Sequence, residues 1–133
     1  MIVLDASVVF KWFQEEPGSK QALQFEQSHV VGEELIAAPD LLFYEVANTF
    51  CYKKNVMQDV ADSALEVLAR MEIRIFVFSP RELKEVFKFA RNYDISIYDA
   101  LYAVLARKLE CNFVTADKAL YARLKKFSWV KLL

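Results

Sequence analysis

The sequence predicts an α/β fold in which helices cover both faces of a central parallel sheet. Short apolar runs alternate with helical patterns along the whole chain. The first run, Ile2 to Leu4, has no alternating polar residue, which is typical of a strand buried on both faces of a parallel sheet. A chain of 133 residues can bury about two thirds of its unfolded surface, so residues 1–133 are expected to form a single domain.

The first third of the chain predicts two strands with two helices between them. Residues 6–13 carry apolar side chains too densely for a loop, so a helix is expected directly after the first strand. The turn at 15–19 offers Ser19 as the N-cap of a polar helix over residues 20–28. The apolar run 35–38 then predicts a short second strand.

The next helix, expected over residues 41–54, is apolar at almost every position. The exceptions are Glu45, Asn48 and Thr49. At 100° per residue these three side chains fall within one 100° sector, so they form a narrow polar stripe on a buried helix. We expect this stripe to line a wet cleft.

The second half of the chain continues the alternation of helices and strands. Two capping-box sequences, Ser79 to Glu82 and Ser96 to Asp99, mark the starts of two of its helices. The expected elements are, in order, a helix at 57–71, a strand at 73–78, a helix ending at 93, a helix at 98–109, a strand at 112–115, a helix at 118–125 and a strand at 129–133. Such alternation implies a parallel sheet with helices on both faces.

Composition narrows the possible functions. The formal net charge is −1, from 17 basic and 18 acidic residues, which argues against a strongly basic nucleic-acid binder. No apolar run approaches the roughly 18 residues of a membrane span, and no signal-like segment opens the chain. We therefore expect a soluble, cytoplasmic protein that does not contact membranes.

The cysteines and the single histidine argue against two further classes of site. Cys51 and Cys111 show no CxxC spacing, so neither a zinc site nor a thiol redox motif is expected, and both are interpreted as buried thiols. His29 lies in a polar stretch with no nucleophile motif beside it, which argues against Ser-His and Cys-His catalysis. It is interpreted as a surface histidine.

Four acidic residues stand out because they lie next to predicted strands and helix starts. Taken singly, Asp5 and Asp117 can be N-caps, Asp99 can pair with Ser96, and Glu45 can be a buried carboxylate satisfied by Tyr or Asn. Asp5 and Asp117 nevertheless follow strands, and ligands bind at the carboxyl ends of parallel strands.

A cluster of these acids would need a compensating charge. Two carboxylates about 4 Å apart repel by roughly 4 kcal/mol at an effective dielectric constant near 20. Either a cation must bind or one acid must stay protonated. Oxygen ligands without histidine or cysteine favour a hard divalent ion such as Mg²⁺ or Mn²⁺.

Four segments together resemble the PIN-domain nucleases and, within them, the VapC-type toxins. The segments are Asp5-Ala6-Ser7, PDLLFYEVAN at 39–48, YDALYAVLA at 98–106 and Val114-Thr115-Ala116-Asp117. They occur in family order across nearly the whole chain, whereas the region between Phe13 and Asp40 shows no clear match.

The resemblance implies a PIN-like three-layer α/β/α sandwich and an endoribonuclease that cleaves single-stranded RNA with Mg²⁺ or Mn²⁺. The implied catalytic residues are Asp5, Glu45, Asp99 and Asp117, the implied metal ligands Asp5, Asp99 and Asp117, and the implied accessory residues Ser7 and Thr115. Glu45 would orient water or a second ion. The ion would lower the pKa of its bound water, and cleavage would leave 5′-phosphate and 3′-hydroxyl ends.

The resemblance also implies partners, namely an RNA substrate, a small antitoxin protein and a second copy of the chain. An aromatic excess could supply an interface or belong to the core; its members are Phe10, Trp12, Phe13, Phe43, Tyr44, Phe50 and Tyr52. Basic residues that follow site segments could contact phosphate, and these are Lys11, Lys53, Lys54 and Lys118.

Other functions compete with a nuclease. An aspartyl-phosphate phosphohydrolase would need a second Asp where Ser7 stands, and a receiver domain would need an Asp where the strand 73–78 ends on Ser79. The residues at both positions argue against those functions. The remaining alternative is a catalytically silent PIN-like module that binds RNA or protein.

Overall fold

The computed structural model describes residues 1–53 and 55–133, and its centre is a five-stranded parallel sheet. The strands are β1 (Ile2–Leu4), β2 (Ile36–Pro39), β3 (Arg74–Phe76), β4 (Asn112–Thr115) and β5 (Val130–Leu132). Their spatial order is β3-β2-β1-β4-β5, and every neighbouring pair is parallel. All three residues of β1 are buried, as expected for a central strand covered on both faces.

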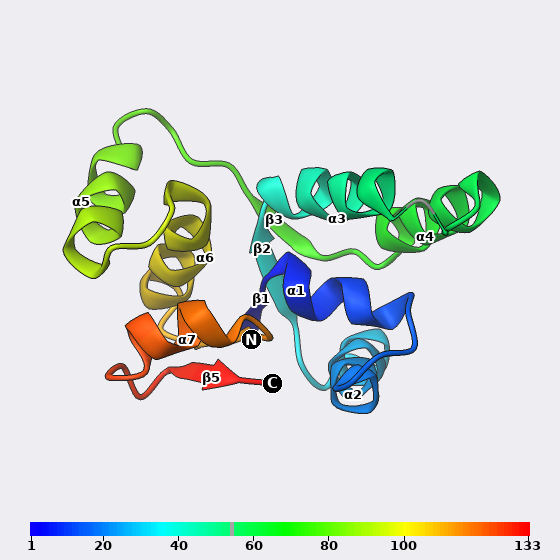
Figure 1. Cartoon of the computed structure of the whole chain (residues 1–133). Helices are drawn as coiled ribbons and strands as arrows, with labels where there is room; N and C mark the ends of the chain where they lie inside the picture. The colour runs from blue at the N-terminus through cyan, green and yellow to red at the C-terminus, as the bar shows by residue number, and fades with distance from the viewer. Residues whose placement is uncertain (54) are drawn as a thin grey trace.

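Helices cover both faces of this sheet, which confirms the predicted three-layer arrangement. The helices are α1 (Ala6–Val9) with the 3₁₀ turn η1 (Phe10–Trp12), α2 (Ser19–Val30), α3 (Leu41–Tyr52), α4 (Gln58–Arg70), α5 (Leu83–Tyr93), α6 (Ile97–Lys108) and α7 (Lys118–Leu124). Helices α1 to α4 lie on one side of the strands and α5 to α7 on the other (Figure 1). In the described residues, no helix is long and apolar enough to cross a membrane.

The order of the strands creates a switch point between β1 and β4. The chain leaves β1 toward β2 on one side and leaves β4 toward β5 on the other. Because parallel crossovers are right-handed, the connections that leave these neighbours pass over opposite faces of the sheet. A crevice therefore opens beyond the carboxyl ends of β1 and β4, which is where open α/β sheets bind ligands.

Two element boundaries differ from the predictions for a local reason. The strand expected at 73–78 spans only Arg74–Phe76, because its neighbour β2 ends opposite Phe76 at Pro39 and then turns into α3. The helix expected at 6–13 is α-helical only to Val9 and continues as η1, where the Phe10 ring packs 4.9 Å from that of Phe50.

The predicted N-cap role of Ser19 is wrong. Helix α2 begins at Ser19 itself, and the cap is Gly18 in the left-handed conformation with φ of 90°. The Ser19 hydroxyl accepts from the Glu16 amide at 3.1 Å and donates to the Gln14 carbonyl at 2.7 Å, so it closes the preceding turn instead.

The interpretation of His29 as a surface residue is also wrong, because its side chain is buried. Nδ1 accepts from the amide of Ile36 at 3.1 Å, so the ring proton lies on Nε2, which donates to the Met71 carbonyl at 2.6 Å. The ring therefore joins the end of α2 to the start of β2 and the end of α4. Sequence reasoning missed it because most of the surrounding stretch, residues 26–34, is polar.

The two cysteines are free thiols. The expectation that both are buried is wrong. Cys51 is exposed near the end of α3 and Cys111 is partly exposed before β4. The aromatic residues divide between core and surface: Phe10 and Phe50 are buried, whereas Tyr44 and Tyr52 are highly exposed.

Candidate functional site

Asp5 lies at the switch point and caps the short helix that follows β1. Its Oδ1 atom accepts from the amides of Ser7 at 3.0 Å and Val8 at 3.2 Å. Its side chain is only 6% exposed. The predicted cap role is therefore confirmed, and it places the carboxylate inside the crevice beyond β1.

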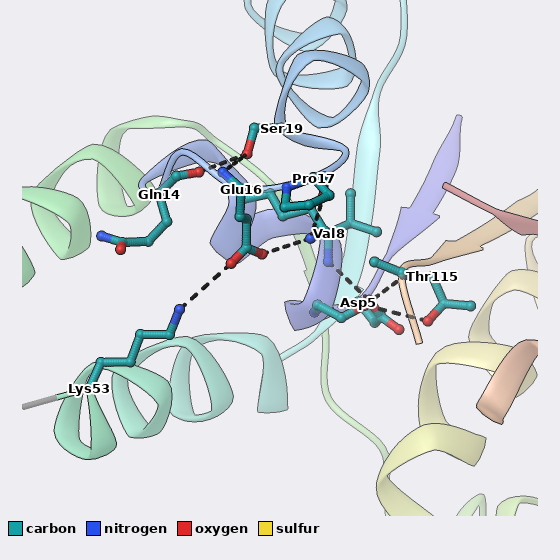
Figure 2. A network of polar contacts seen from close by, with 11 residues as sticks. Asp5, Val8, Gln14, Glu16, Pro17, Ser19, Lys53 and Thr115 are labelled. Atoms are coloured by element: carbon teal, nitrogen blue, oxygen red, sulfur yellow. Dashed lines mark hydrogen bonds and ion pairs between the residues drawn. The ribbon is translucent and has the colours of Figure 1, made fainter. Parts of the chain in front are cut away.

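Ser7 and Thr115 join the loop after β1 to the loop after β4. The Ser7 hydroxyl donates to Asp5 Oδ1 and accepts from the Ala116 amide at 2.8 Å. The Thr115 hydroxyl lies 3.4 Å from that of Ser7 and accepts from the Asp117 amide at 3.0 Å. These two hydroxyls thus fix the loops that carry Asp5 and Asp117 relative to each other, as Figure 2 shows around Asp5 and Thr115.

Asp117 is the exposed member of the predicted set. It caps α7, because its Oδ1 accepts from the amides of Ala119 at 2.7 Å and Leu120 at 3.0 Å. The other carboxylate oxygen accepts no hydrogen bond from the described residues. Asp117 lines the same cleft as Glu45.

Glu45 and Tyr102 connect the two helical layers across the crevice. Glu45 lies on α3 and Tyr102 on α6, and the tyrosine hydroxyl donates to Glu45 Oε2 at 2.6 Å. The tyrosine side chain is almost completely buried. This contact matches the prediction that a tyrosine would satisfy Glu45, and it fixes one carboxylate oxygen while the other is left for a ligand.

Asp99 pairs with Ser96 at the start of α6. The Ser96 hydroxyl accepts from the Asp99 amide at 3.0 Å and donates to Asp99 Oδ2 at 2.7 Å. The predicted capping pair is therefore formed. Because Oδ2 is used, Oδ1 is the oxygen that Asp99 can offer to a ligand.

Burial and neighbouring carboxylates raise the pKa values of side chains in the crevice. Burial raises the pKa of Asp5 to about 6, and the nearby charge of Glu45 adds to this effect. Burial also raises the pKa of Glu45, with a further contribution from Asp99, although the Tyr102 hydroxyl acts in the opposite direction. Burial, followed by Glu45, Asp5 and Asp99, raises the pKa of the Tyr102 hydroxyl, which therefore stays protonated.

The crevice opens into a cleft with a volume of about 520 Å³. The polar stripe of Glu45, Asn48 and Thr49 lines it, which confirms the prediction from the helix pattern. Its other lining residues are Ala6, Ser7, Phe10, Lys11, Glu16, Lys53, Ala116 and Asp117. Asp5 does not line the cleft itself, but its Oδ1 accepts from the hydroxyl of Ser7, which does.

The structure brings the four predicted acids to one end of the sheet but does not close them around a point. The charge of Glu45 raises the pKa of Asp5, that of Asp99 raises the pKa of Glu45, and all three acids raise the pKa of Tyr102. Asp117 lies on the cleft wall. Across residues 1–53 and 55–133, no three histidine, cysteine or acidic side chains are gathered at metal-ligand spacing. The donor set consists of oxygen atoms, which suits a hard divalent ion.

Two residues around the site were not predicted from the sequence. Tyr102 is one helical turn beyond Asp99, so the i, i+3 spacing from the acid could have identified it as facing the crevice. Glu16 lines the cleft but comes from the turn after η1, in the region that matched no family segment. Nothing in its local sequence distinguishes it from an ordinary surface acid.

Comparisons with known proteins agree with the fold. The profile of the PIN domain matches residues 2–126. A curated relative, Ribonuclease VapC3 of Pyrobaculum aerophilum, is 32% identical over 123 residues, which cover 90% of this chain and 91% of the relative.

Two solved structures are similar in fold. VapC20 of Mycobacterium tuberculosis, described as a sarcin-ricin loop cleaving toxin, has a TM-score of 0.70 at 13% identity, covering 92% of this chain and 94% of its own. VapBC2 of Rickettsia felis, bound to a DNA fragment from their promoter, has a TM-score of 0.66 at 16% identity, covering 100% of this chain and 98% of its own. At these identities the likeness concerns the fold.

Proposed function

The chain belongs to the PIN-domain family, and from this we propose that it is an endoribonuclease that hydrolyses single-stranded RNA with Mg²⁺ or Mn²⁺. The observation that carries the proposal is the buried Asp5 carboxylate, which lies beside other acids with its pKa raised to about 6. Keeping several carboxylates together costs free energy unless a cation binds among them.

We assign the ion to the carboxylates that face the crevice. Asp5, Asp99 and Asp117 would hold it directly or through water, and Glu45 would orient a water molecule or a second ion. The hydrogen bonds support this assignment, because Glu45, Asp99 and Asp117 each use one oxygen within the fold and keep the other available. When bound, the ion supplies a nucleophilic water and offsets charge that develops on the phosphate.

The side chains around the ion prepare the reaction. Tyr102 fixes Glu45 through Oε2, so Oε1 is presented to the cleft and can take a proton from the attacking water. The raised pKa of Glu45 makes it a better base for that proton. Water adds to phosphorus and the 3′-oxygen leaves with a proton, which gives 5′-phosphate and 3′-hydroxyl ends.

We further propose that the chain is the toxin of a toxin-antitoxin pair and acts in the cytoplasm as a homodimer. The name of the curated relative and the VapBC2 assembly support the antitoxin. Exposed aromatic side chains, Tyr44 and Tyr52 on α3 and Phe87 on α5, offer surface for a second protein. Residues 1–133 act as a single PIN-like domain in this proposal.

A catalytically silent RNA- or protein-binding module is the competing function. Ordinary binding does not require four acids at one sheet edge, so their presence favours the nuclease. The test is cleavage of single-stranded RNA by the purified protein with Mg²⁺ or Mn²⁺, and in excess EDTA. We expect cleavage only with metal, with 5′-phosphate product ends. Equal cleavage in EDTA would contradict the assignment, and absence of cleavage with either ion would favour the silent module.

A further inference from the structure

We propose that Lys11 and Lys53 form a clamp for the phosphates of the RNA backbone, with Glu16 fixing the two ammonium groups on one side of the cleft. The inference rests on the proposed function and deepens it, because it states how the substrate is held beside the acids. The sequence alone pointed to four lysines without distinguishing among them.

The contacts of Glu16 bring two lysines from distant parts of the chain together. Lys11 Nζ lies 2.7 Å from Glu16 Oε1, and Lys53 Nζ lies 3.7 Å from Glu16 Oε2. Lys11 belongs to η1, whereas Lys53 follows the last residue of α3. Figure 2 shows Lys53 reaching across to Glu16 from α3, in the same view as Asp5 and Thr115.

Other contacts hold both ammonium groups in place before any substrate binds. Lys11 Nζ also donates to the Pro17 carbonyl at 2.9 Å, and Lys53 Nζ lies 4.6 Å from the centre of the Phe10 ring. The turn beside Lys11 contains Gly18, whose φ of 90° lies in the left-handed region that favours glycine. A preorganised pair of cations loses little side-chain freedom when an anion binds.

The charges along the cleft explain why such a clamp is needed. Glu16, Glu45 and Asp117 line the cleft, so an RNA phosphate approaching the acids meets like charge. Among the described residues that line this cleft, the cationic ones are Lys11 and Lys53. Lys11 uses two of its three N–H donors on Glu16 and Pro17, so the third can reach a phosphate oxygen.

The structure separates these two lysines from the other candidates. Lys118 begins α7 and does not line the cleft, and Lys54 lies outside the described residues. Lys53 is 36% exposed and Lys11 13% exposed, so the former is open to solvent while the latter is mostly enclosed by its contacts. The cleft wall formed by α3 and η1 is therefore the side on which the backbone is held.

The experiment measures RNA binding and its salt dependence in a cleavage-deficient Asp99→Asn protein with Mg²⁺. The probe is a short fluorescent oligouridine, because phosphate contacts are independent of base sequence. We expect Lys11→Met and Lys53→Met each to weaken binding roughly fivefold at low salt. The double variant should lower the slope of log K against log salt by about 0.7 for each phosphate that the lysines no longer neutralise.

Lys88→Met in α5 is the matched control, since this exposed lysine lies in the layer on the other side of the sheet (Figure 1). The control should bind like the parent and with the same slope. Three results would each overturn the clamp. The control could bind RNA as weakly as the cleft variants, the double variant could show unchanged RNA affinity and salt slope, or the Asp99→Asn protein could bind RNA without any dependence on salt.

If Lys11→Met does not fold, Lys53→Met provides the test, because the Lys53 side chain is 36% exposed, against 13% for Lys11. Failure of the clamp and failure of the nuclease proposal are distinguishable. If the unmodified protein cleaves RNA but the binding slopes are unchanged, only the clamp is wrong. If it does not cleave, the change in slope still decides whether the two lysines hold the backbone.

Discussion

A buried carboxylate lies at the carboxyl end of the sheet and a buried histidine at its amino end, and their surroundings differ. Asp5 follows β1 at the carboxyl end and is 6% exposed, while His29 is bonded to Ile36 at the amino end of β2 and is 8% exposed. The histidine finds a main-chain partner for each ring nitrogen. The aspartate has hydrogen-bond donors too, but it also faces Glu45, and burial raises its pKa.

This difference distinguishes a structural from a functional buried group. His29 joins three elements with hydrogen bonds that need no further partner, so it stabilises the fold by itself. Asp5 is satisfied as a helix cap, but burial, and to a smaller extent the charge of Glu45, disfavours its ionised form. A buried acid of this kind at a switch point of the sheet is the basis of the proposed metal site. Substitutions at the two ends should therefore differ in their effects on activity and on stability.

The largest effect is expected from replacing an acid at the carboxyl end of the sheet, and it should concern RNA cleavage alone. Asp99→Asn should lower RNA cleavage at least about a thousandfold, equivalent to roughly 4 kcal/mol of transition-state stabilisation, because it removes a charged ligand. The Ser96 cap can be kept by the amide oxygen, so the unfolding midpoint should stay close to that of the parent. Initial cleavage rates and urea unfolding measure the two quantities. The expectation would be contradicted if the variant kept its activity. It would also be contradicted if the variant were inactive because it is unfolded.

The second largest effect is expected from replacing His29 at the amino end of the sheet, and it should concern stability alone. His29→Ala leaves the Ile36 amide and the Met71 carbonyl without their partner, so the free energy of unfolding should fall by roughly 4 kcal/mol. Urea unfolding at neutral pH gives the value, and Val30→Ala, next to it and 68% exposed, is the matched control. The folded fraction should still cleave RNA at the parent rate. A decrease in stability similar to that of the control would show that His29 is not structural.

The pH dependence of stability sharpens the description of Asp5. Its pKa is about 6 in the folded protein and 3.8 in the unfolded chain, so the folded state binds more protons between these values. In EDTA, stability should therefore fall as pH rises from about 3 to about 7, by about 3 kcal/mol in total from this residue. Asp5→Asn removes this contribution, and the difference between parent and variant isolates it from other acids. A difference that does not change across this range would contradict the raised pKa.

The smallest effect is expected from the contact between the two helical layers. Tyr102→Phe removes the hydroxyl that holds Glu45 Oε2 but keeps the buried ring. Cleavage should fall roughly tenfold, since Glu45 loses its orientation but keeps its charge, and stability should change by about 1 kcal/mol or less. Comparing cleavage rates at saturating RNA gives the result. Unchanged activity would show that Tyr102 only fills space.

The fold and the acids were predictable because they depend on local patterns. An uninterrupted apolar run followed by Asp5 predicts a central parallel strand with a carboxylate at its end, and the structure confirms this placement. The stripe on α3 likewise predicted the cleft wall, since helical periodicity is a property of neighbouring residues. These features need no knowledge of distant contacts.

The remaining features depend on residues that meet only in the folded chain. His29 is a polar residue in a mostly polar stretch, and its Nε2 atom finds its partner in Met71, 42 positions later. Glu16 gains its role from Lys53, at the far end of α3. The end of β3 is set by Pro39 on the neighbouring strand rather than by the apolar residues that follow it. Sequence patterns alone do not contain these pairings.

The most direct test of the proposed metal site is a titration of the EDTA-treated protein with Mn²⁺ at neutral pH, followed by thermal unfolding. Binding to the folded state should raise the midpoint in the parent and in His29→Ala alike, corresponding to about 2.7 kcal/mol at a hundred times the dissociation constant. Asp5→Asn should show little or no rise, because a ligand has been removed. An equal rise in Asp5→Asn, or none in the parent, would contradict the claim that the buried acids form a metal site.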